Sequence, residues 1–156
     1  MKLQKICVAV KDMSESALEA DMVKEIAGDN AQVRLIHVRS QENFGRARFP
    51  LEEGEQSKSI LDAALLEFQR VGIKAHGKVC SALVGKEAEA IVDEATKWGA
   101  DAIVLGHPHH GKLSARVRGG LVQRVIQSAP CPVVVAASSA SLQAPSLPRE
   151  RVAQVA

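Results

Sequence analysis

Five apolar runs that alternate with segments of helical periodicity constrain the fold of this chain more than any other feature. The runs cover residues 6–10, 33–38, 73–82, 101–105 and 132–137. Between them, residues 16–28, 52–71, 86–98 and 115–128 place apolar side chains three and four positions apart, which is the spacing of an amphipathic helix. Strands that alternate with helices predict a doubly wound α/β fold, here a single parallel sheet of five strands with four helices.

Residues typical of helix ends agree with these boundaries. Ser16 followed by Glu19 fits a capping box at the start of the first helix. Gly28, Gly72 and Gly99 stand where the first three helices are expected to end.

Two segments depart from the regular pattern. Residues 39–50 are mostly polar, and we interpret them as the longest loop inside the domain. Phe44 and Phe49 lie in it, where they either cap an edge of the sheet or contact a protein partner. The run 73–82 alternates apolar and polar residues, which predicts a half-exposed strand near one edge of the sheet.

The length of the chain, 156 residues, is that of one domain. Residues 138–156 are rich in Ser, Ala and Pro and lack an apolar stripe, so we expect a domain over residues 1–137 and a flexible C-terminal tail over 138–156. No apolar run reaches the roughly 20 residues that span a bilayer, and the N-terminus lacks the pattern of a cleavable signal. These features predict a cytoplasmic protein without membrane insertion.

Composition argues against nucleic acid as a partner. The net charge is +2 with 24% charged residues, which gives little electrostatic attraction for a polyanion. Aromatic residues make up 3% of the chain, too few for a base-stacking surface. The three cysteines, Cys7, Cys80 and Cys131, are odd in number and widely spaced, which indicates reduced thiols and no disulfide framework.

The stretch from Asp101 to Ala137, DAIVLGHPHHGKLSARVRGGLVQRVIQSAPCPVVVAA, is the part most informative about function. It has the order of a strand, a loop rich in glycine and histidine, a helix and a second strand. In doubly wound sheets, ligands bind beyond the carboxyl ends of the strands, where the winding reverses. The loops 11–15 and 106–114 are therefore the first candidates for a site.

Three segments carry a resemblance to a known family. Residues 6–20 (ICVAVKDMSESALEA), 100–126 (ADAIVLGHPHHGKLSARVRGGLVQRVI) and 129–135 (APCPVVV) resemble the universal stress protein family, in the same order of elements. The resemblance implies an adenine nucleotide alpha hydrolase-like fold with strand order 3-2-1-4-5. It also implies a homodimer that pairs through the fifth strand, Pro132 to Ala137, an apolar strand at a sheet edge.

Nucleotide-binding members of that family carry a motif that this chain matches in part. The motif is G-x-x-G, nine residues, then Gly and Ser or Thr, together with an Asp after the first strand. Here its glycine and hydroxyl positions fall on Gly106, His109, Gly119 and Gly120, and the Asp position falls on Lys11. Gly120 offers no hydroxyl, and a bond to a charged group contributes about 1.5–3 kcal/mol. With His109 and Lys11, this change predicts ATP binding weaker by about 10²-fold or more.

Other residues still allow this region to bind a nucleotide or an anion. Gly111 lies two residues beyond His109, where the motif has a glycine, and in a shifted loop it can adopt the backbone conformation that a glycine allows. Lys11 and Lys112 carry positive charge that attracts an anion. The candidate ligand-binding residues are Val10, Lys11, Asp12, Val38, Gly106, His109, Gly111, Lys112, Gly119 and Gly120. No cofactor is expected, although ATP, AMP or a phosphate-like anion remain candidate ligands.

The histidines of the loop allow a weaker alternative. His107, His109 and His110 lie within four residues, and imidazoles are common ligands of zinc, copper and nickel. Stiff polar loop structure is the simpler interpretation, so we expect no metal. No Ser/His/Asp order or Walker-type motif occurs, and we assign no catalytic residue.

Two functional hypotheses follow from the sequence. The first is a small dimeric stress-response module for binding or signalling, without high-affinity ATP binding and without catalytic activity. The second is an adenine-nucleotide sensor or slow ATPase that uses a re-formed loop between Gly106 and Gly120.

Overall fold

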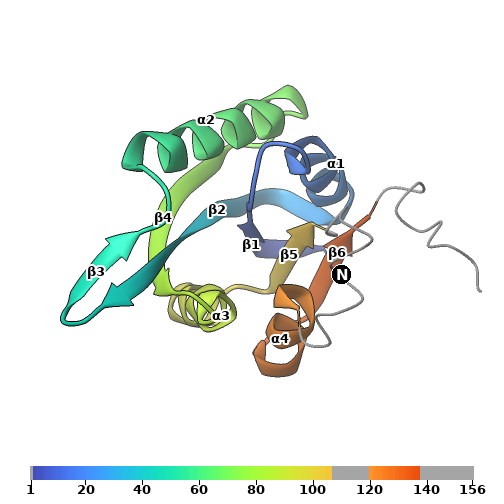
Figure 1. Cartoon of the computed structure of the whole chain (residues 1–156). Helices are drawn as coiled ribbons and strands as arrows, with labels where there is room; N and C mark the ends of the chain where they lie inside the picture. Colours follow the sequence, from blue (N-terminus) through green and yellow to red (C-terminus); the bar gives the residue numbers. More distant parts are fainter. Residues whose placement is uncertain (1, 107–119, 138–156) are drawn as a thin grey trace, which may run out of the picture.

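The fold is a single twisted sheet with helices on both faces (Figure 1). The computed structural model describes residues 2–106 and 120–137. The elements in chain order are β1 (Leu3–Ala9), α1 (Ser16–Ile26), β2 (Ala27–Phe44), β3 (Ala47–Pro50), α2 (Gly54–Arg70), β4 (Ala75–Leu83), α3 (Glu87–Trp98), β5 (Ala102–Gly106), α4 (Leu121–Ser128) and β6 (Val133–Ala136). The expected helix over 115–128 is seen from Leu121, and residues 115–119 lie outside the described ranges.

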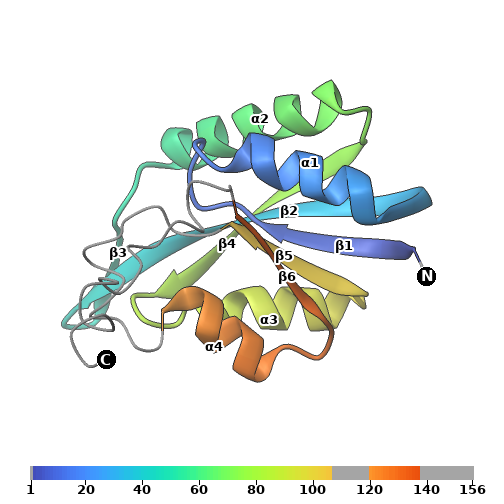
Figure 2. The same ribbon diagram turned by 90° about the vertical axis from the view of Figure 1, so that its right-hand side faces the viewer.

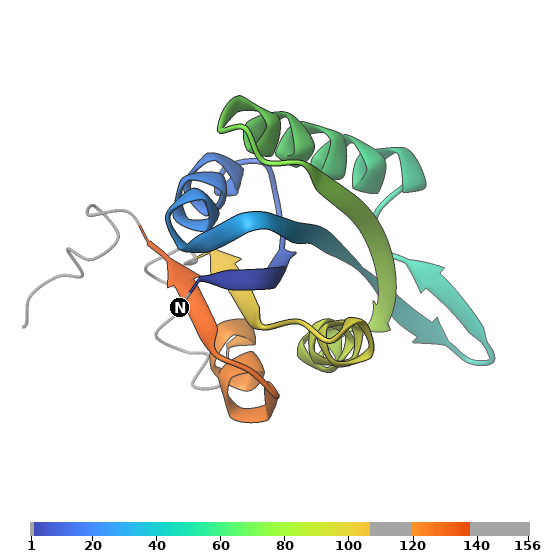
Figure 3. The same ribbon diagram turned by 180° about the vertical axis from the view of Figure 1, so that it is seen from behind.

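The strand order confirms the doubly wound α/β class. Within the described residues, five parallel strands lie in the order β4-β2-β1-β5-β6, which is the expected 3-2-1-4-5 when only these five are counted. The chain winds outward from β1 to β4 and then returns to wind through β5 and β6. Figure 3 shows β4 and β6 at opposite edges of the sheet. The edge position expected for the strand around residues 73–82 is therefore confirmed by β4.

The expectation of a long loop over residues 39–50 is wrong. The segment is a β-hairpin: β2 continues to Phe44, and β3 pairs antiparallel with it from Ala47 to Pro50. Gly45 in the two-residue connection has φ of 61°, a conformation that glycine adopts easily. Phe44 and Phe49 pack edge to face on the hairpin, with ring centroids 6.3 Å apart, and remain 75% and 53% exposed. The hairpin adds a sixth strand to the sheet.

Helices cover both faces of the sheet (Figure 2). α1 and α2 pack on one face and α3 and α4 on the other. Along β1, Ile6 and Val8 belong to the core beneath α1 and α2, while Cys7 belongs to the core beneath α3 and α4. Because successive side chains of a strand point to opposite faces, a strand covered on both faces is apolar throughout. Two-sided burial thus explains the uniform apolar run at residues 6–10.

The expected capping box at the start of α1 is wrong. The N-cap residue is Glu15, and Ser16 is already inside the helix, where its hydroxyl donates to the Asp12 carbonyl oxygen at 3.4 Å. The helix starts one residue earlier than a capping box requires, so Glu19 turns toward the core and is 1% exposed. At the end of α3, by contrast, Gly99 adopts the expected left-handed conformation, with φ of 73°.

None of the helices in the described ranges is both long and apolar enough to cross a membrane.

Candidate functional site

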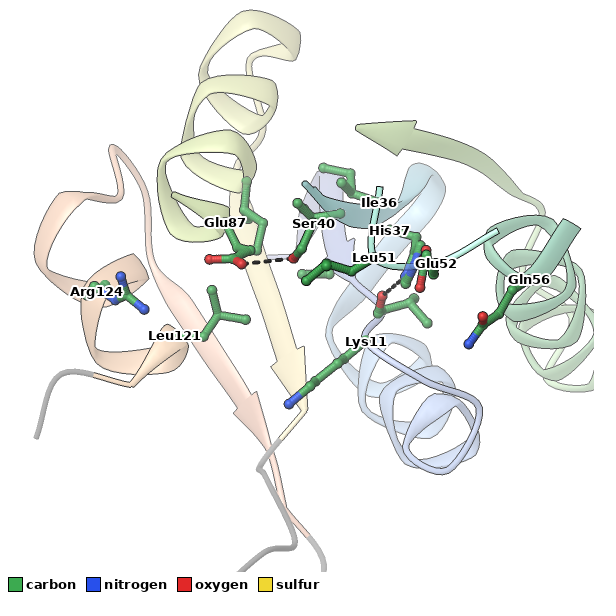
Figure 4. A pocket seen from close by; sticks show the side chains of 14 residues that line it. Lys11, Ile36, His37, Ser40, Leu51, Glu52, Gln56, Glu87, Leu121 and Arg124 are labelled. Carbon is green, nitrogen blue, oxygen red and sulfur yellow. Dashed lines mark hydrogen bonds and ion pairs between the residues drawn. The ribbon is translucent and has the colours of Figure 1, made fainter. Parts of the chain in front are cut away.

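A cavity of about 440 Å³ opens at the carboxyl end of β1, beside the middle of β2. Figure 4 shows the side chains that surround it. β1, β2 and the segment before α2 supply most of its wall, and α2, α3 and α4 supply the rest. The lining residues are Ala9, Val10, Lys11, Ile36, His37, Val38, Ser40, Leu51, Glu52, Gln56, Glu87, Ile91, Leu121 and Arg124. Half of these residues are apolar and half are polar or charged.

A hydrogen-bonded His37 forms one side of the cavity. Its ring is 3% exposed, with Nδ1 2.8 Å from the Val10 carbonyl oxygen and Nε2 2.5 Å from Glu52 Oε1. Both ring nitrogens of His37 thus have an oxygen of the protein within hydrogen-bond distance. The pair joins the carboxyl half of β2 to the segment that leads into α2.

Glu52 is held as a carboxylate by this arrangement. Its Oε1 also accepts a hydrogen bond from the Ser57 hydroxyl at 2.5 Å. Burial by itself raises the pKa of Glu52, but the hydrogen bonds from Ser57 and His37 outweigh burial and hold that pKa below its ordinary value. Glu52 therefore presents a fixed negative charge beside the cavity.

The opposite side of the cavity is built from three further polar residues. Ser40 Oγ donates to Glu87 Oε1 at 2.8 Å, and the Gly85 N–H donates to Glu87 Oε2 at 2.9 Å. Arg124 on α4 donates from Nη1 to the Gly85 carbonyl oxygen at 2.7 Å, while its buried Nε has no hydrogen-bond partner in the described part of the chain. Arg124 and the exposed Lys11 bring positive charge to the cavity margin.

Two carboxylates meet at the carboxyl end of β5. A Cβ added to Gly106 would overlap Glu15 Oε2 and lie 3.0 Å from Glu19 Oε1, so both side chains reach the same point. Burial, followed by the negative charges of Glu15 and Asp12, raises the pKa of Glu19 to about 8. The Gly106 amide acts in the opposite direction, although its geometry falls short of a hydrogen bond. Glu19 is therefore mostly neutral at pH 7, and Glu15 and Asp12 supply the negative charge at the start of the expected phosphate loop.

The candidate residues from the sequence have different positions in the structure. Val10, Lys11 and Val38 line the cavity. Asp12 does not line it, and its Oδ1 accepts hydrogen bonds from the Ser14 N–H and hydroxyl. Gly106 ends β5 beside the two carboxylates, and Gly120 is the N-cap of α4, next to the lining residue Leu121. The other candidates lie outside the described residues: His107, His109, His110, Gly111, Lys112 and Gly119.

Sequence reasoning missed most of the polar wall. His37 lies in an apolar run of the sequence, and its place in the cavity was not foreseen. Glu52, Glu87 and Arg124 come from three separate helical regions and share no local motif. The signal that could have found His37 and Ser40 is their place at the carboxyl end of the apolar run 33–38, because ligands bind at strand ends in such sheets.

A metal site of three or more side chains is not found in residues 2–106 and 120–137, where His, Cys, Asp and Glu form no such group. The alternative based on the three loop histidines falls outside these ranges. The described cysteines are free, and burial raises the pKa of the Cys7 thiol to about 12, so it is an unreactive core residue.

Comparison with known proteins identifies the family. The model of the universal stress protein family matches residues 2–137. The chain belongs to the universal stress protein family. No curated protein sequence matches it closely enough to add a second line of identification.

Solved structures of universal stress proteins share this fold. One from Archaeoglobus fulgidus, in complex with dAMP, is 26% identical, with a TM-score of 0.61 over 86% of this chain and 98% of that one. A universal stress protein in complex with cAMP is 20% identical, with a TM-score of 0.65 over 89% and 100%. A family member from Arabidopsis thaliana with AMP bound is 16% identical, with a TM-score of 0.59 over 94% and 98%. The last two similarities concern the fold alone.

Proposed function

We propose that this universal stress protein is a non-enzymatic binding module that takes a nucleotide of the adenosine monophosphate class and has low affinity for ATP. The observation that carries this proposal is the pair of carboxylates, Glu15 and Glu19, beside Gly106. Negative charge at that end of the site opposes a triphosphate far more than a single phosphate, because charges of the same sign repel most strongly where water is excluded.

The cavity supports a nucleoside as the common part of the ligand. Its volume of about 440 Å³ is within the range of small-molecule sites. Val10, Ile36 and Val38 offer the apolar contacts that a planar base needs, and Leu51 points into the space between the two polar sides (Figure 4). The relative from Archaeoglobus fulgidus binds dAMP, a ligand of this class.

Arg124 is the proposed anchor for a single phosphate. Its guanidinium lines the cavity, with one bond to Gly85 and a buried Nε that has no partner in the described residues. Arginine donates to phosphate oxygens with well-defined geometry. By contrast, Gly120, at the N-terminus of α4, lacks the hydroxyl that the family motif places there. The phosphate is thus directed toward Arg124 and away from Gly106.

In the cell, we propose that the protein acts as a cytoplasmic homodimer in a stress response. Ligand occupancy would change the surface that it shows to a protein partner. The exposed Phe44 and Phe49 of the hairpin are the proposed contact for such a partner.

Isothermal titration with adenosine, AMP and ATP, each in EDTA and in Mg²⁺, tests the proposal. We expect AMP to bind more tightly than ATP. R124Q should weaken the binding of AMP by about tenfold or more, since a hydrogen bond to a charged group contributes about 1.5–3 kcal/mol. The same substitution should leave the binding of adenosine unchanged. An ATP dissociation constant below about 1 µM in either buffer contradicts the proposal.

A second pair of variants tests the location of the ligand. Leu51 and Leu66 are similarly exposed, at 57% and 66%, but Leu51 lines the cavity and Leu66 lies on α2 outside it. L51E places a carboxylate against the ligand and should reduce binding of AMP, while L66E should not. Equal effects of the two substitutions would place the ligand elsewhere.

A further inference from the structure

Glu19 is buried in a way that its local sequence does not require. The residue lies in the first turn of α1 and is 1% exposed. Neither of its carboxylate oxygens has a hydrogen-bond partner in the described part of the chain. Buried polar groups in folded proteins nearly always have a partner, and a buried carboxylate without one is especially costly. Such a side chain points to a ligand.

A second carboxylate approaches the same point. Glu15 Oε2 lies where a Cβ of Gly106 would be, and Glu19 Oε1 lies 3.0 Å from that position, so the absence of a side chain at Gly106 makes room for the Glu15 carboxylate. The two carboxylates converge there, yet Glu19 accepts no hydrogen bond from a protonated Glu15. Ionised Glu19 is disfavoured by burial beside the Glu15 carboxylate, and a divalent cation that binds both oxygens would favour the ionised form.

The donor atoms decide which cation fits. Carboxylate oxygens are hard ligands, which favour Mg²⁺ and Mn²⁺ over zinc or copper. Mg²⁺ is commonly held by one or two carboxylates and completes its octahedral shell with water, so it does not need a third protein carboxylate. Glu15 is half-buried, which leaves the site open toward water on that side. Asp12 adds negative charge nearby, as its effect on Glu19 shows.

We propose that Glu15 and Glu19 hold a divalent cation of the Mg²⁺ or Mn²⁺ type against Gly106. The cation is bound by the protein itself and needs no nucleotide, so the site does not rest on the proposed ligand of the cavity. It would offset the charge of the two carboxylates, but it would not replace the hydroxyl that Gly120 lacks.

The test uses the full chain, freed of metal with EDTA and dialysed, and titrated with Mn²⁺ alone. Electron paramagnetic resonance of free Mn²⁺ should show one bound ion per chain, which Mg²⁺ displaces. E19Q removes one ligand charge and should weaken Mn²⁺ binding by at least about tenfold. G106A should weaken binding to a similar extent although both carboxylates remain, because its methyl group would displace the Glu15 carboxylate from its place beside Glu19.

Two substitutions serve as matched controls. E25Q removes an exposed carboxylate from the same helix. G54A adds a methyl group at a glycine with no atom within 4 Å of the new Cβ. Both should bind Mn²⁺ like the unaltered chain. Circular dichroism establishes that each variant is folded, and if E19Q is not, G106A decides. No Mn²⁺ binding by the unaltered chain, or unchanged binding in folded G106A, overturns the proposal.

Discussion

His37 Nε2 lies 2.5 Å from Glu52 Oε1, and this contact joins the carboxyl half of β2 to the segment just before α2. It also fixes one side of the cavity, because both residues line it. The side-chain exposures of 4% for His37 and 17% for Glu52 mean that water screens the pair little. The pair therefore contributes both to stability and to the shape of the site.

Removal of the Glu52 charge should destabilise the protein in a pH-dependent way. E52Q should lower the free energy of unfolding by about 1–3 kcal/mol at pH 7, because a charged hydrogen-bonded partner of His37 is lost. The pKa of Glu52 in the folded protein is below its ordinary value. Its contribution is thus present above the ordinary pKa of a glutamate and is lost as the pH falls through the lowered folded pKa. Urea unfolding from pH 7 down to below pH 4 measures this difference.

Glu55 provides the control for this measurement, since it is an exposed acidic residue in the first turn of α2. E55Q should change stability by no more than about 0.5 kcal/mol at any of these pH values. A constant difference between E52Q and the unaltered chain across the whole range would contradict the linkage.

The two partners of Glu94 should contribute unequally to the stability of the fold. Glu94 bridges Arg34 at 2.7 Å and Lys78 at 2.8 Å. The Arg34 guanidinium also stacks over Trp98, 4.6 Å from the ring centroid, whereas Lys78 has a side chain that is 50% exposed. R34A should therefore cost about 1–3 kcal/mol and K78A about 0.2–1 kcal/mol in chemical denaturation at pH 7. A larger loss for K78A than for R34A would refute this ranking.

The outer edge of β6 should mediate the proposed homodimer. The Ile103 N–H donates to the Pro132 carbonyl oxygen, and Ile103 pairs with Val133 in the parallel register. This pattern directs the N–H groups of Val133 and Val135 away from β5. V135P removes one outward donor without loss of a bond to β5, so it should convert a dimer to a monomer in sedimentation at tens of micromolar, with the far-ultraviolet spectrum retained. A monomeric unaltered chain under those conditions would reject the dimer.

The parallel strands could be predicted from sequence because two-sided burial leaves a continuous apolar run. Ile103 and Val104 illustrate this on β5, where neighbouring residues enter different cores and are both fully buried. The hairpin gave no such signal, since every residue of β3 is exposed and its pairing buries no apolar face. Gly45 between two short extended segments was the one local clue to a tight turn.

The site was less predictable because tertiary packing assembles it. Glu52 and Ser57 are 15 and 20 residues from His37, and no spacing rule links them. Glu19 was misinterpreted for a different reason. A shift of the helix start by one residue changes a capping position into a core position, and element boundaries are the least certain part of any sequence pattern.

The hairpin ends at Pro50, and the next residue, Leu51, is already part of the cavity wall. Glu52, bonded to His37, follows directly. The proposed partner contact and the proposed ligand pocket are therefore neighbours along the backbone, with no intervening residue between the hairpin and the cavity wall. Assays of the proposed partner should accordingly be run with and without the nucleotide.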